Sequence, residues 1–281
     1  MNLARVRTWA SRRARRTGGE LCFRNVFAEK ERAMSVTEEK PVTTGVDKSG
    51  KRVRAMFASI AKKYDFLNHL LSFNIDRYWR RHTIGAVGVE PGDLVLDCCT
   101  GTADLALAFH RATGSGCRIV GVDFCREMLV LGNRKIDRAR AHDRLILVEG
   151  DSQSLPLPSD TFGVVTVAFG LRNVADTVRG IDEMIRVARP GGKVAILEFS
   201  RPRGAILGRL YLFFFKRILP NVGQAIAPND TGAYRYLPNS VLEFPDGRAM
   251  LDLLSSRGLV ETRMKSLTFG IATLYVGVKK A

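Results

Sequence analysis

The sequence has 281 residues, which is enough for one domain with a substantial core and short accessory segments. Its apolar fraction of 46% and charged fraction of 26% are ordinary for a soluble protein, and its longest uncharged run, residues 266–278, is too short to span a bilayer. The net charge of +16 leaves two explanations open: an anionic partner such as phospholipid or nucleic acid, or a basic tail.

The N-terminal segment carries much of this charge. Residues 1–33 contain nine Lys or Arg and three Glu, with no acidic residue before Glu20. Three interpretations remain open: an Arg-rich organellar targeting peptide, a disordered basic tail, or a true translation start at Met34. We expect residues 1–48 to form a disordered extension and residues 49–281 to form the folded domain.

The number and spacing of the cysteines indicate the redox state of the compartment. There are five of them, with no CxxC spacing of the metal-binding kind, so we expect a reduced compartment and no metal. The expected location is the cytoplasm, peripheral to the inner face of the membrane, or the mitochondrial matrix if the N-terminus is a targeting peptide.

The predicted elements indicate an α/β fold. Apolar periodicity predicts a helix beginning near Val53 and a second over 76–87. Short apolar runs then alternate with helical segments, which predicts parallel strands in a doubly wound sheet; the runs are DLVLDCC, CRIVGVDF, LILVEGD, FGVVTVAFG and KVAILEFS. The final runs, LVETRMKSLTF and IATLYVGVKK, have no helix between them and predict an antiparallel hairpin. A mostly parallel, seven-stranded, Rossmann-like sheet that ends in a hairpin is the architecture of class I methyltransferases.

The loop VLDCCTGTAD, residues 95–104, follows the first predicted strand. Where such a strand turns into a helix, backbone N–H groups converge, and Gly101 lets a ligand approach the main chain. A nucleotide-binding loop of the acidic-x-Gly-x-Gly-x-Gly type begins with an acid, here Asp97, and has glycine also at the positions of Cys99 and Ala103. This loop alone is a weak indication of a ligand site.

Acidic residues at the ends of successive predicted strands strengthen the indication of a ligand site. Asp123 ends the second strand, where doubly wound folds place an acid for ribose hydroxyls, and Asp151-Ser152 follow the third, near an adenine amino group. The alternative for each Asp is a helix cap. Asp104, in the first turn of the next helix, would repel a pyrophosphate but suits a cationic sulfonium, so the sequence predicts S-adenosylmethionine rather than a dinucleotide.

Several segments together resemble the ubiquinone/menaquinone biosynthesis C-methyltransferases: YDFLNHLLSFNIDRYWRR, VLDCCTGTADL, LPLPSDTFGVVTVAFGLRNV, RVARPGGKVAILEFS and APNDTGAYRYL. The resemblance implies methyl transfer from S-adenosylmethionine to a ring carbon of a prenylated quinol, either demethylmenaquinol or the benzoquinol precursor of ubiquinone. It also implies that Thr102, Asp123 and the Asp151-Ser152 pair contact the cofactor. The family pattern has Gly where Asn74 stands and His at Asp76.

Methylation of a quinol carbon requires an ionised ring hydroxyl, so the site needs a base and a positive charge. We predict that Arg172, just after the fourth strand, stabilises the phenolate; a surface ion pair with Asp176 is the alternative. The base remains open between a water molecule, Asp230 and Tyr234. His69 and His82 are further candidates, although a lone His on an apolar helix face is usually structural.

The prenyl tail of such a substrate needs an apolar channel. The segment AILGRLYLFFFKRIL, residues 205–219, is a candidate wall, with Arg209, Lys216 and Arg217 available for lipid phosphates, although an ordinary buried helix explains it equally well. The expected partners are the prenylated quinol, the membrane surface and a second copy of the chain.

Two rival functions remain open. A methyltransferase acting on RNA or DNA would explain the positive charge, but AFGL follows the fourth strand in place of an Asn-Pro-Pro-Tyr motif, so no nucleic acid is expected. A methyltransferase acting on another small hydrophobic molecule is a further alternative. A non-catalytic scaffold of a quinone-biosynthesis complex would explain the missing glycines at Cys99 and Ala103.

Overall fold

The computed structural model describes residues 48–72, 74–114, 116–202, 209 and 233–281. The chain divides into two units between Thr44 and Gly45, and all described residues belong to the second unit. The predictions for the N-terminal extension, for Asp230 and for nearly all of the apolar segment 205–219 therefore lie outside the described residues.

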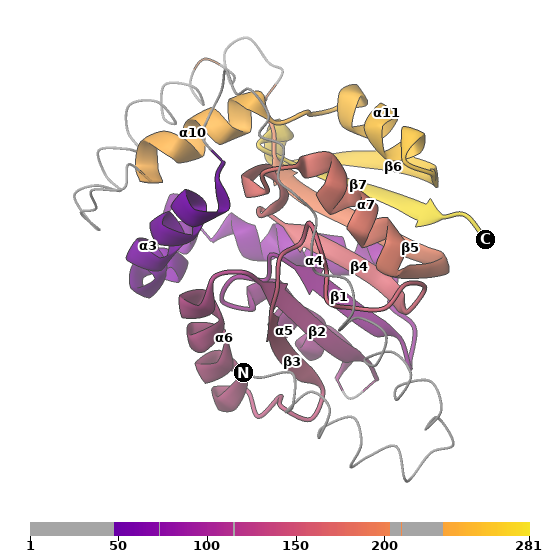
Figure 1. The fold of residues 1–281 in the computed structure, drawn as a ribbon, viewed down its shortest axis with the longest axis horizontal. Coiled ribbons are helices and arrows are strands. Elements are labelled where there is room, and N and C mark those ends of the chain that lie inside the picture. Colours follow the sequence, from indigo (N-terminus) through magenta and orange to yellow (C-terminus); the bar gives the residue numbers. More distant parts are fainter. Residues whose placement is uncertain (1–47, 73, 115, 203–208, 210–232) are drawn as a thin grey trace, which may run out of the picture. The chain divides into compact units, whose positions relative to one another are not determined.

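A seven-stranded sheet forms the centre of the domain, with the strand order β3-β2-β1-β4-β5-β7-β6 (Figure 1). The first five strands are parallel, whereas β7 runs antiparallel to both β5 and β6. The strands are β1 (Leu94–Cys98), β2 (Arg118–Asp123), β3 (Leu145–Glu149), β4 (Phe162–Ala168), β5 (Ala188–Phe199), β6 (Leu259–Leu267) and β7 (Ala272–Lys279). This topology confirms the predicted class I methyltransferase architecture.

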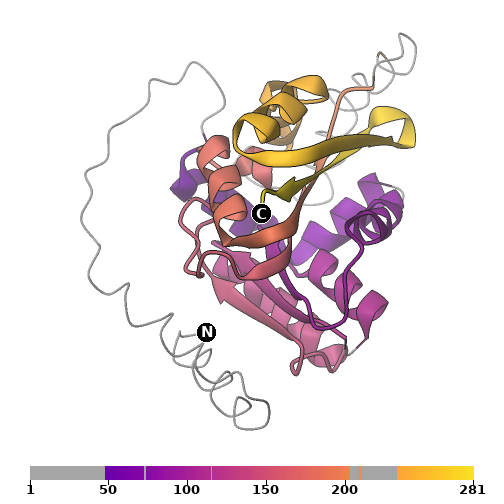
Figure 2. The same cartoon turned by 90° about the vertical axis from the view of Figure 1, so that its right-hand side faces the viewer.

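Helices cover both faces of the sheet, which explains why its central strands are almost continuously apolar (Figures 1 and 2). Helices α4, α5 and α6 pack into one apolar cluster with the sheet, and α7 and α11 lie on the other face. The described helices are α3 (Gly50–Leu71), α4 (Ile75–Val87), α5 (Asp104–Thr113), α6 (Arg126–Arg138), α7 (Thr177–Val187), α10 (Ala233–Glu243) and α11 (Arg248–Ser256), with short 3₁₀ turns η2 (Leu171–Asn173) and η4 (Thr268–Gly270).

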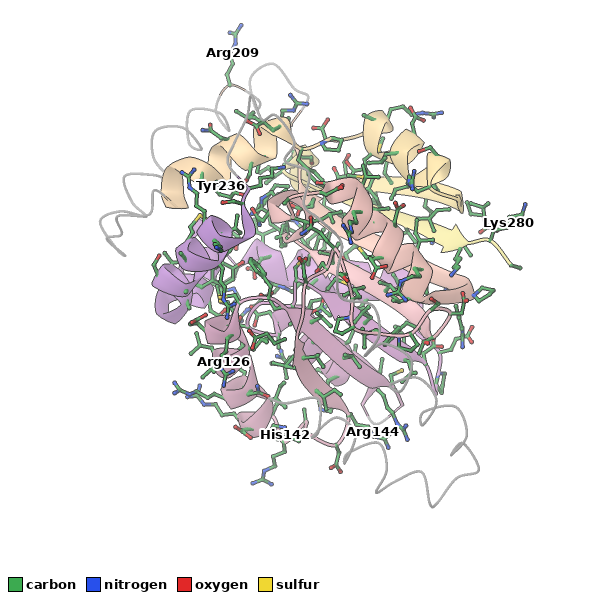
Figure 3. All side chains as sticks on the ribbon, in the orientation of Figure 1. Arg126, His142, Arg144, Arg209, Tyr236 and Lys280 are labelled. Carbon is green, nitrogen blue, oxygen red and sulfur yellow. The ribbon has the colours of Figure 1, made fainter. Side chains whose placement is uncertain are left out.

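Helix α3 does not pack on the sheet but against other helices. Its predicted apolar stripe is buried: Val53, Met56 and Ile60 form a cluster with Tyr236 of α10 (Figure 3). A second small cluster joins Ala61 to Cys125 and Met128 at the start of α6. The helix is thus held between α6 and α10, next to the carboxyl ends of the parallel strands.

The two departures from the family pattern near α4 have structural roles. Asn74, where the family has Gly, adopts a left-handed conformation (φ 60°, ψ 8°) just before the helix, a conformation that Asn tolerates better than most residues. Asp76 is buried, and its carboxylate contacts Ser72, His69 and Arg80. Although burial opposes ionisation, Arg80 and these hydrogen bonds hold the pKa of Asp76 below its usual value. Both positions support the turn between α3 and α4.

Candidate cofactor site

The loop after β1 has the backbone of a glycine-rich loop although it contains one glycine. Cys99, Gly101 and Ala103, at the three glycine positions of the pattern, all have positive φ angles of 49°, 56° and 65°. Such angles cost little for Gly101 but are uncommon and strained for Cys99 and Ala103. The surroundings must therefore hold Cys99 and Ala103 in a backbone conformation that glycine adopts more readily.

Asp97 is buried beneath the loop and is not among the described residues that line the cavity next to it. Its carboxylate accepts a hydrogen bond from the Thr100 hydroxyl at 2.6 Å, and the Thr166 hydroxyl lies 3.3 Å from its other oxygen. Burial raises the pKa of Asp97 to about 7, against the hydrogen bonds that lower it. The Thr166 hydroxyl is within donating distance of both the Asp97 carboxylate and the carbonyl of Leu96, the latter at 3.1 Å.

This raised pKa has a measurable consequence for stability. Between the ordinary value of 3.8 and the folded value of about 7, the folded state holds a proton on Asp97 that the unfolded state has released. The Asp97 contribution to the free energy of unfolding therefore falls as the pH rises, by about 1.4 kcal/mol per pH unit between pH 5 and 6. Urea unfolding at pH 5, 6 and 7 should show this slope in the difference between the wild type and Asp97→Asn. Identical pH dependence of the two proteins would contradict it.

Asp123, at the end of β2, organises the same loop. One carboxylate oxygen accepts a hydrogen bond from the backbone N–H of Gly101 at 2.8 Å, and the other accepts one from the N–H of Cys125 at 2.8 Å. Burial raises the pKa of Asp123 to about 6, and these backbone hydrogen bonds oppose the increase. The carboxylate thus joins the β1 loop to the start of α6 and still lines a cavity.

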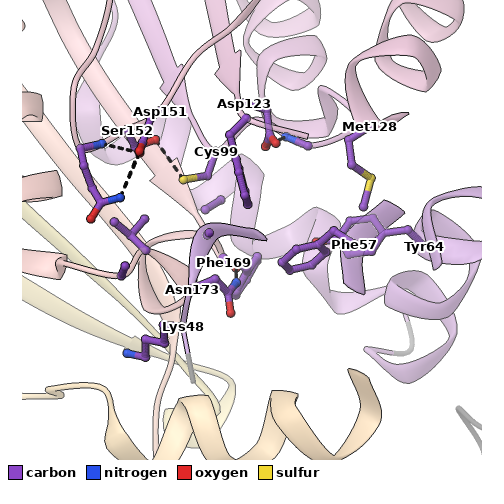
Figure 4. Close-up of a pocket in the computed structure, with 18 residues that line it drawn as sticks. Lys48, Phe57, Tyr64, Cys99, Asp123, Met128, Asp151, Ser152, Phe169 and Asn173 are labelled. Carbon is purple, nitrogen blue, oxygen red and sulfur yellow. Dashed lines mark hydrogen bonds between the residues drawn. The ribbon is translucent and has the colours of Figure 1, made fainter. Parts of the chain in front are cut away.

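That cavity has a volume of about 690 Å³ including its open mouth, within the usual range for small-molecule sites (Figure 4). Its polar end contains Asp123, Asp151 and Ser152, which come from the ends of β2 and β3 as predicted. The Asp151 carboxylate accepts hydrogen bonds from Gln153, and the Ser152 hydroxyl lies 3.2 Å from the sulfur of Cys99.

The rest of the cavity is largely apolar and aromatic. Helix α3 supplies Phe57 and Tyr64, whose rings meet edge to face with centroids 5.9 Å apart, while α6 supplies Met128. Phe169 and Asn173 come from the turn after β4 (Figure 4). A polar end with a buried carboxylate, continuous with an apolar end, suits a nucleoside bound beside a planar hydrophobic molecule.

Gly170 is needed in this turn because the β1 loop passes so close to it. A Cβ atom placed on Gly170 would lie 2.3 Å from the Cβ of Cys99 and 3.2 Å from its sulfur. The first distance is far below any van der Waals contact, so the two loops approach each other as closely as their backbones permit.

Arg172 lies below the cavity. Its guanidinium donates to Glu198 of β5 at 2.8 Å and to the carbonyl of Phe169, and it lies over the ring of Phe199. Arg172 is 5% exposed and Glu198 1%, so this is a buried ion pair, not the surface pair with Asp176 that was the alternative; Asp176 instead caps α7. Arg172 is not among the described residues that line the cavity.

Two other predicted residues have environments that the sequence did not indicate. The hydroxyl of Thr102 points to Asp65 of α3 at 2.5 Å, and Asp104 forms ion pairs with Lys135 and Arg80. The charge of Asp104 is therefore already engaged in ion pairs within the protein, and Asp104 is not among the described residues that line the cavity, so the argument that its charge attracts a sulfonium is not supported. Tyr234 lies on α10, but its side chain is outside the described part of the structure.

Lys48, just before α3, was missed by the sequence analysis. It lies at the end of the cavity away from Asp123, and it is the only Lys or Arg among the described lining residues (Figure 4). Burial lowers the pKa of its ammonium group, and the positive charge of Arg172 lowers it further, against Glu243 and Glu198. A Lys in a polar lead-in segment gives no sequence signal of such a position.

Comparison with known proteins identifies the family. The model of the ubiE/COQ5 methyltransferase family matches residues 45–279. A ubiquinone/menaquinone biosynthesis C-methyltransferase UbiE from Geobacter sulfurreducens is 46% identical over 230 residues, which cover 82% of this chain and 89% of the relative. A protein of the same name from Marinomonas sp. is 39% identical over 233 residues, covering 83% of this chain and 92% of the relative.

Solved structures confirm the fold at much lower identity. A putative methyltransferase in complex with the Haloferax volcanii Trm112 methyltransferase activator is 18% identical, with a TM-score of 0.58 over 80% of this chain and 98% of the other. Haemonchus contortus phosphoethanolamine N-methyltransferase 2 is 12% identical, with a TM-score of 0.60 over 82% of this chain and 60% of the other. The family match confirms the resemblance seen in the sequence and the use of S-adenosylmethionine. The chain belongs to the ubiE/COQ5 methyltransferase family.

Proposed function

We propose that this protein transfers a methyl group from S-adenosylmethionine to a ring carbon of a prenylated quinol in respiratory quinone biosynthesis. The observation that carries the proposal is that one cavity has the carboxylate of Asp123 at one end and the aromatic side chains of Phe57, Tyr64 and Phe169 around the other. The names of the relatives, ubiquinone/menaquinone biosynthesis C-methyltransferases that are 38–46% identical, support a naphthoquinol or benzoquinol as the acceptor.

The reaction requires electron density at a ring carbon next to a hydroxyl. The donor supplies a methyl group on a cationic sulfur; the new C–C bond forms as the S–C bond breaks, and the electron pair of that bond remains on sulfur. The acceptor loses its hydroxyl proton to a base or to water before this step. The proton of the attacked carbon leaves afterwards as the ring oxygen regains a proton, so one proton is released for each methyl group transferred. The residues of the chain orient the two molecules, stabilise the phenolate and give the released proton a path to a base or to water.

Lys48 is the cavity residue best suited to contact the phenolate. It lies at the acceptor end, and partial burial strengthens the interaction of its ammonium group with a developing negative charge. The contact of Arg172 with the phenolate stays a prediction. In the described structure Arg172 holds the turn that contains Phe169 and Asn173, through the carbonyl of Phe169 and through Glu198.

A quinone analysis tests the function. The protein is expressed in a bacterial strain that lacks its own quinone C-methyltransferase, and the cellular quinones are analysed by mass spectrometry. We expect methylated menaquinone, ubiquinone or both to return, and the pattern names the acceptor. An Asp123→Ala variant serves as the negative control. If a stable, S-adenosylmethionine-binding wild type restores neither quinone, the proposed acceptor class is wrong.

The role of Lys48 predicts a separation of catalysis from donor binding. Lys48→Met should lower kcat with a solubilised quinol by about 100-fold, because a charge-assisted hydrogen bond to the phenolate contributes about 1.5–3 kcal/mol. The Kd for S-adenosylmethionine should stay within about 2-fold of the wild type. Lys48→Arg, which keeps the positive charge, should recover part of kcat. The matched control is Arg257→Met, since the ion pair of Arg257 with Asp182 is exposed and contributes little. A kcat for Lys48→Met equal to that of the control would remove Lys48 from the mechanism.

We also propose that the protein binds the membrane peripherally, because a prenylated quinol is dissolved in the bilayer and the chain carries a net charge of +16. Exposed Arg126, His142 and Lys280 project from the domain (Figure 3). None of the described helices is long and apolar enough to cross a membrane. The full chain should float with vesicles that contain anionic lipid and not with neutral vesicles, and the interaction should weaken at high salt. Equal flotation with both vesicle types would contradict a charge-driven attachment.

A further inference from the structure

A polar network connects α3 to the cofactor loop. The ammonium group of Lys135, on α6, contacts Asp65 of α3 at 2.8 Å, the hydroxyl of Thr102 at 3.0 Å and the carboxylate of Asp104. Thr102 also donates to Asp65 at 2.5 Å. Three residues, from α3, the β1–α5 connection and the start of α5, thus meet at one half-buried ammonium group of α6, outside the described lining of the cavity.

A second set of contacts continues from Asp104 to His69, which lies about one turn after Asp65 near the C-terminal end of α3. Arg80 of α4 approaches Asp104 at 3.5 Å and also pairs with Asp76, which His69 of α3 contacts at 2.9 Å. Although burial opposes it, Arg80 and Lys135 hold the pKa of Asp104 below its usual value, so the carboxylate is charged at neutral pH. Besides the His69 ring, the whole network holds three carboxylates, of Asp65, Asp76 and Asp104, and two cations, Lys135 and Arg80, so loss of Lys135 leaves three carboxylates with one cation.

The network lies between the cofactor loop and helix α3, both of which contribute residues to the cavity. Thr102 follows Gly101, whose N–H donates to Asp123, and it stands between that residue and Ala103, which has a strained φ angle. Asp65 follows Tyr64, whose ring lines the cavity. A strained loop persists only when its surroundings fix it. Lys135 contacts the side chains that fix the loop and the helix that closes the cavity.

We propose that Lys135 is a positioning residue that couples the cofactor loop to the seating of α3 over the cavity. When S-adenosylmethionine holds the loop, Thr102 and Asp104 present their side chains to Lys135, and Lys135 holds Asp65 and with it α3. Because such coupling is reciprocal, a seated α3 also holds the loop in the conformation that binds the donor. Without the ammonium group, Asp65 and Asp104 repel each other across the junction.

The direct test is donor affinity. If Lys135→Met lowers the fraction of molecules with a seated α3 to about a tenth, the apparent Kd for S-adenosylmethionine rises about 10-fold, because affinity scales with the binding-competent fraction. Isothermal titration calorimetry measures it without any quinol, so this result does not depend on the acceptor. Lys135→Arg should restore most of the affinity. Asp65→Asn should weaken binding similarly, and the double variant should be no weaker than either single variant, as expected for residues of one network.

A second measurement distinguishes positioning from general stability. Helix α3 contains Lys62 and Lys63, where trypsin cleaves only if the helix opens locally. In the wild type, S-adenosylmethionine should slow cleavage at these bonds, and in Lys135→Met cleavage should be faster and less protected by the donor. Lys279→Met is the matched control, because the side chain of Lys279 is 20% exposed, against 22% for Lys135, and pairs with Asp160, just before the amino end of β4 and away from the cofactor loop. If both variants have the same Kd and the same cleavage rate at α3, the proposal is wrong.

Discussion

Asp123→Asn should weaken S-adenosylmethionine binding by about 100-fold. The carboxylate of Asp123 accepts N–H groups from Gly101 and Cys125 and still lines the cavity, where it can accept the ribose hydroxyls of the donor. An Asn has one acceptor oxygen, and its amide N–H group would face a backbone N–H. Loss of one charged hydrogen bond, together with this unfavourable contact, corresponds to about 3 kcal/mol, which is about 100-fold in Kd.

The pH dependence of the same variant makes this prediction specific. Burial raises the pKa of Asp123 to about 6, so the carboxylate takes up a proton as the pH falls through that value. Donor affinity should be constant above pH 7 and should weaken below pH 6 by up to about 10-fold per unit, whereas Asp123→Asn should show a flat profile. Calorimetry between pH 5 and 8 measures both, and circular dichroism checks that the variant is folded. A profile shared by both proteins would assign the titration to another group.

Asp123 also illustrates what the sequence makes predictable. A run such as RIVGVD is recognisable as a buried parallel strand, and the ends of parallel strands must meet at one edge of the sheet. This geometry alone brings Asp123 and Asp151 to the same cavity, without knowledge of any side-chain contact. The loop at Cys99 follows the same logic, since its backbone is set by the strand-to-helix turn and tolerates residues other than glycine at some cost.

Contacts between segments far apart in the sequence were not predictable in this way. Arg172 pairs with Glu198, 26 positions later in the chain, and Lys135 reaches Asp65 over 70 positions. Either cation, taken alone, is equally compatible with an exposed side chain. Helix α10 was missed for a local reason: Pro238 lies within it, and proline argues against a helix interior. Packing of α10 against α3 stabilises the helix despite Pro238. Tertiary packing of this kind leaves no periodic apolar pattern in so short a segment.

The close approach of the β1 loop to the turn after β4 predicts a large effect of substituting Gly170. Gly170→Ala places a Cβ atom 2.3 Å from the Cβ of Cys99, which is rigidly attached to a strained backbone and cannot rotate away. The β1 loop must then shift and move Gly101 relative to Asp123. We expect the free energy of unfolding to fall by about 2 kcal/mol, a typical cost of overpacking, and the affinity for S-adenosylmethionine to fall at least 10-fold.

A second substitution, Cys99→Gly, should relieve the clash that Gly170→Ala creates. Cys99→Gly removes the Cβ atom that clashes and replaces a residue at φ 49° with the one that best tolerates this angle. In the double variant the next contact of the added Cβ atom is with Val167 at 3.4 Å, an ordinary distance. The thermal unfolding temperature should therefore return to the wild-type value, and the Kd for S-adenosylmethionine should return to within about 3-fold of that of the wild type. Cys99→Gly alone should bind the donor normally. If the double variant is as weak as Gly170→Ala, the clash is not with Cys99, and the turn after β4 must require glycine for a reason other than the approach of the cofactor loop.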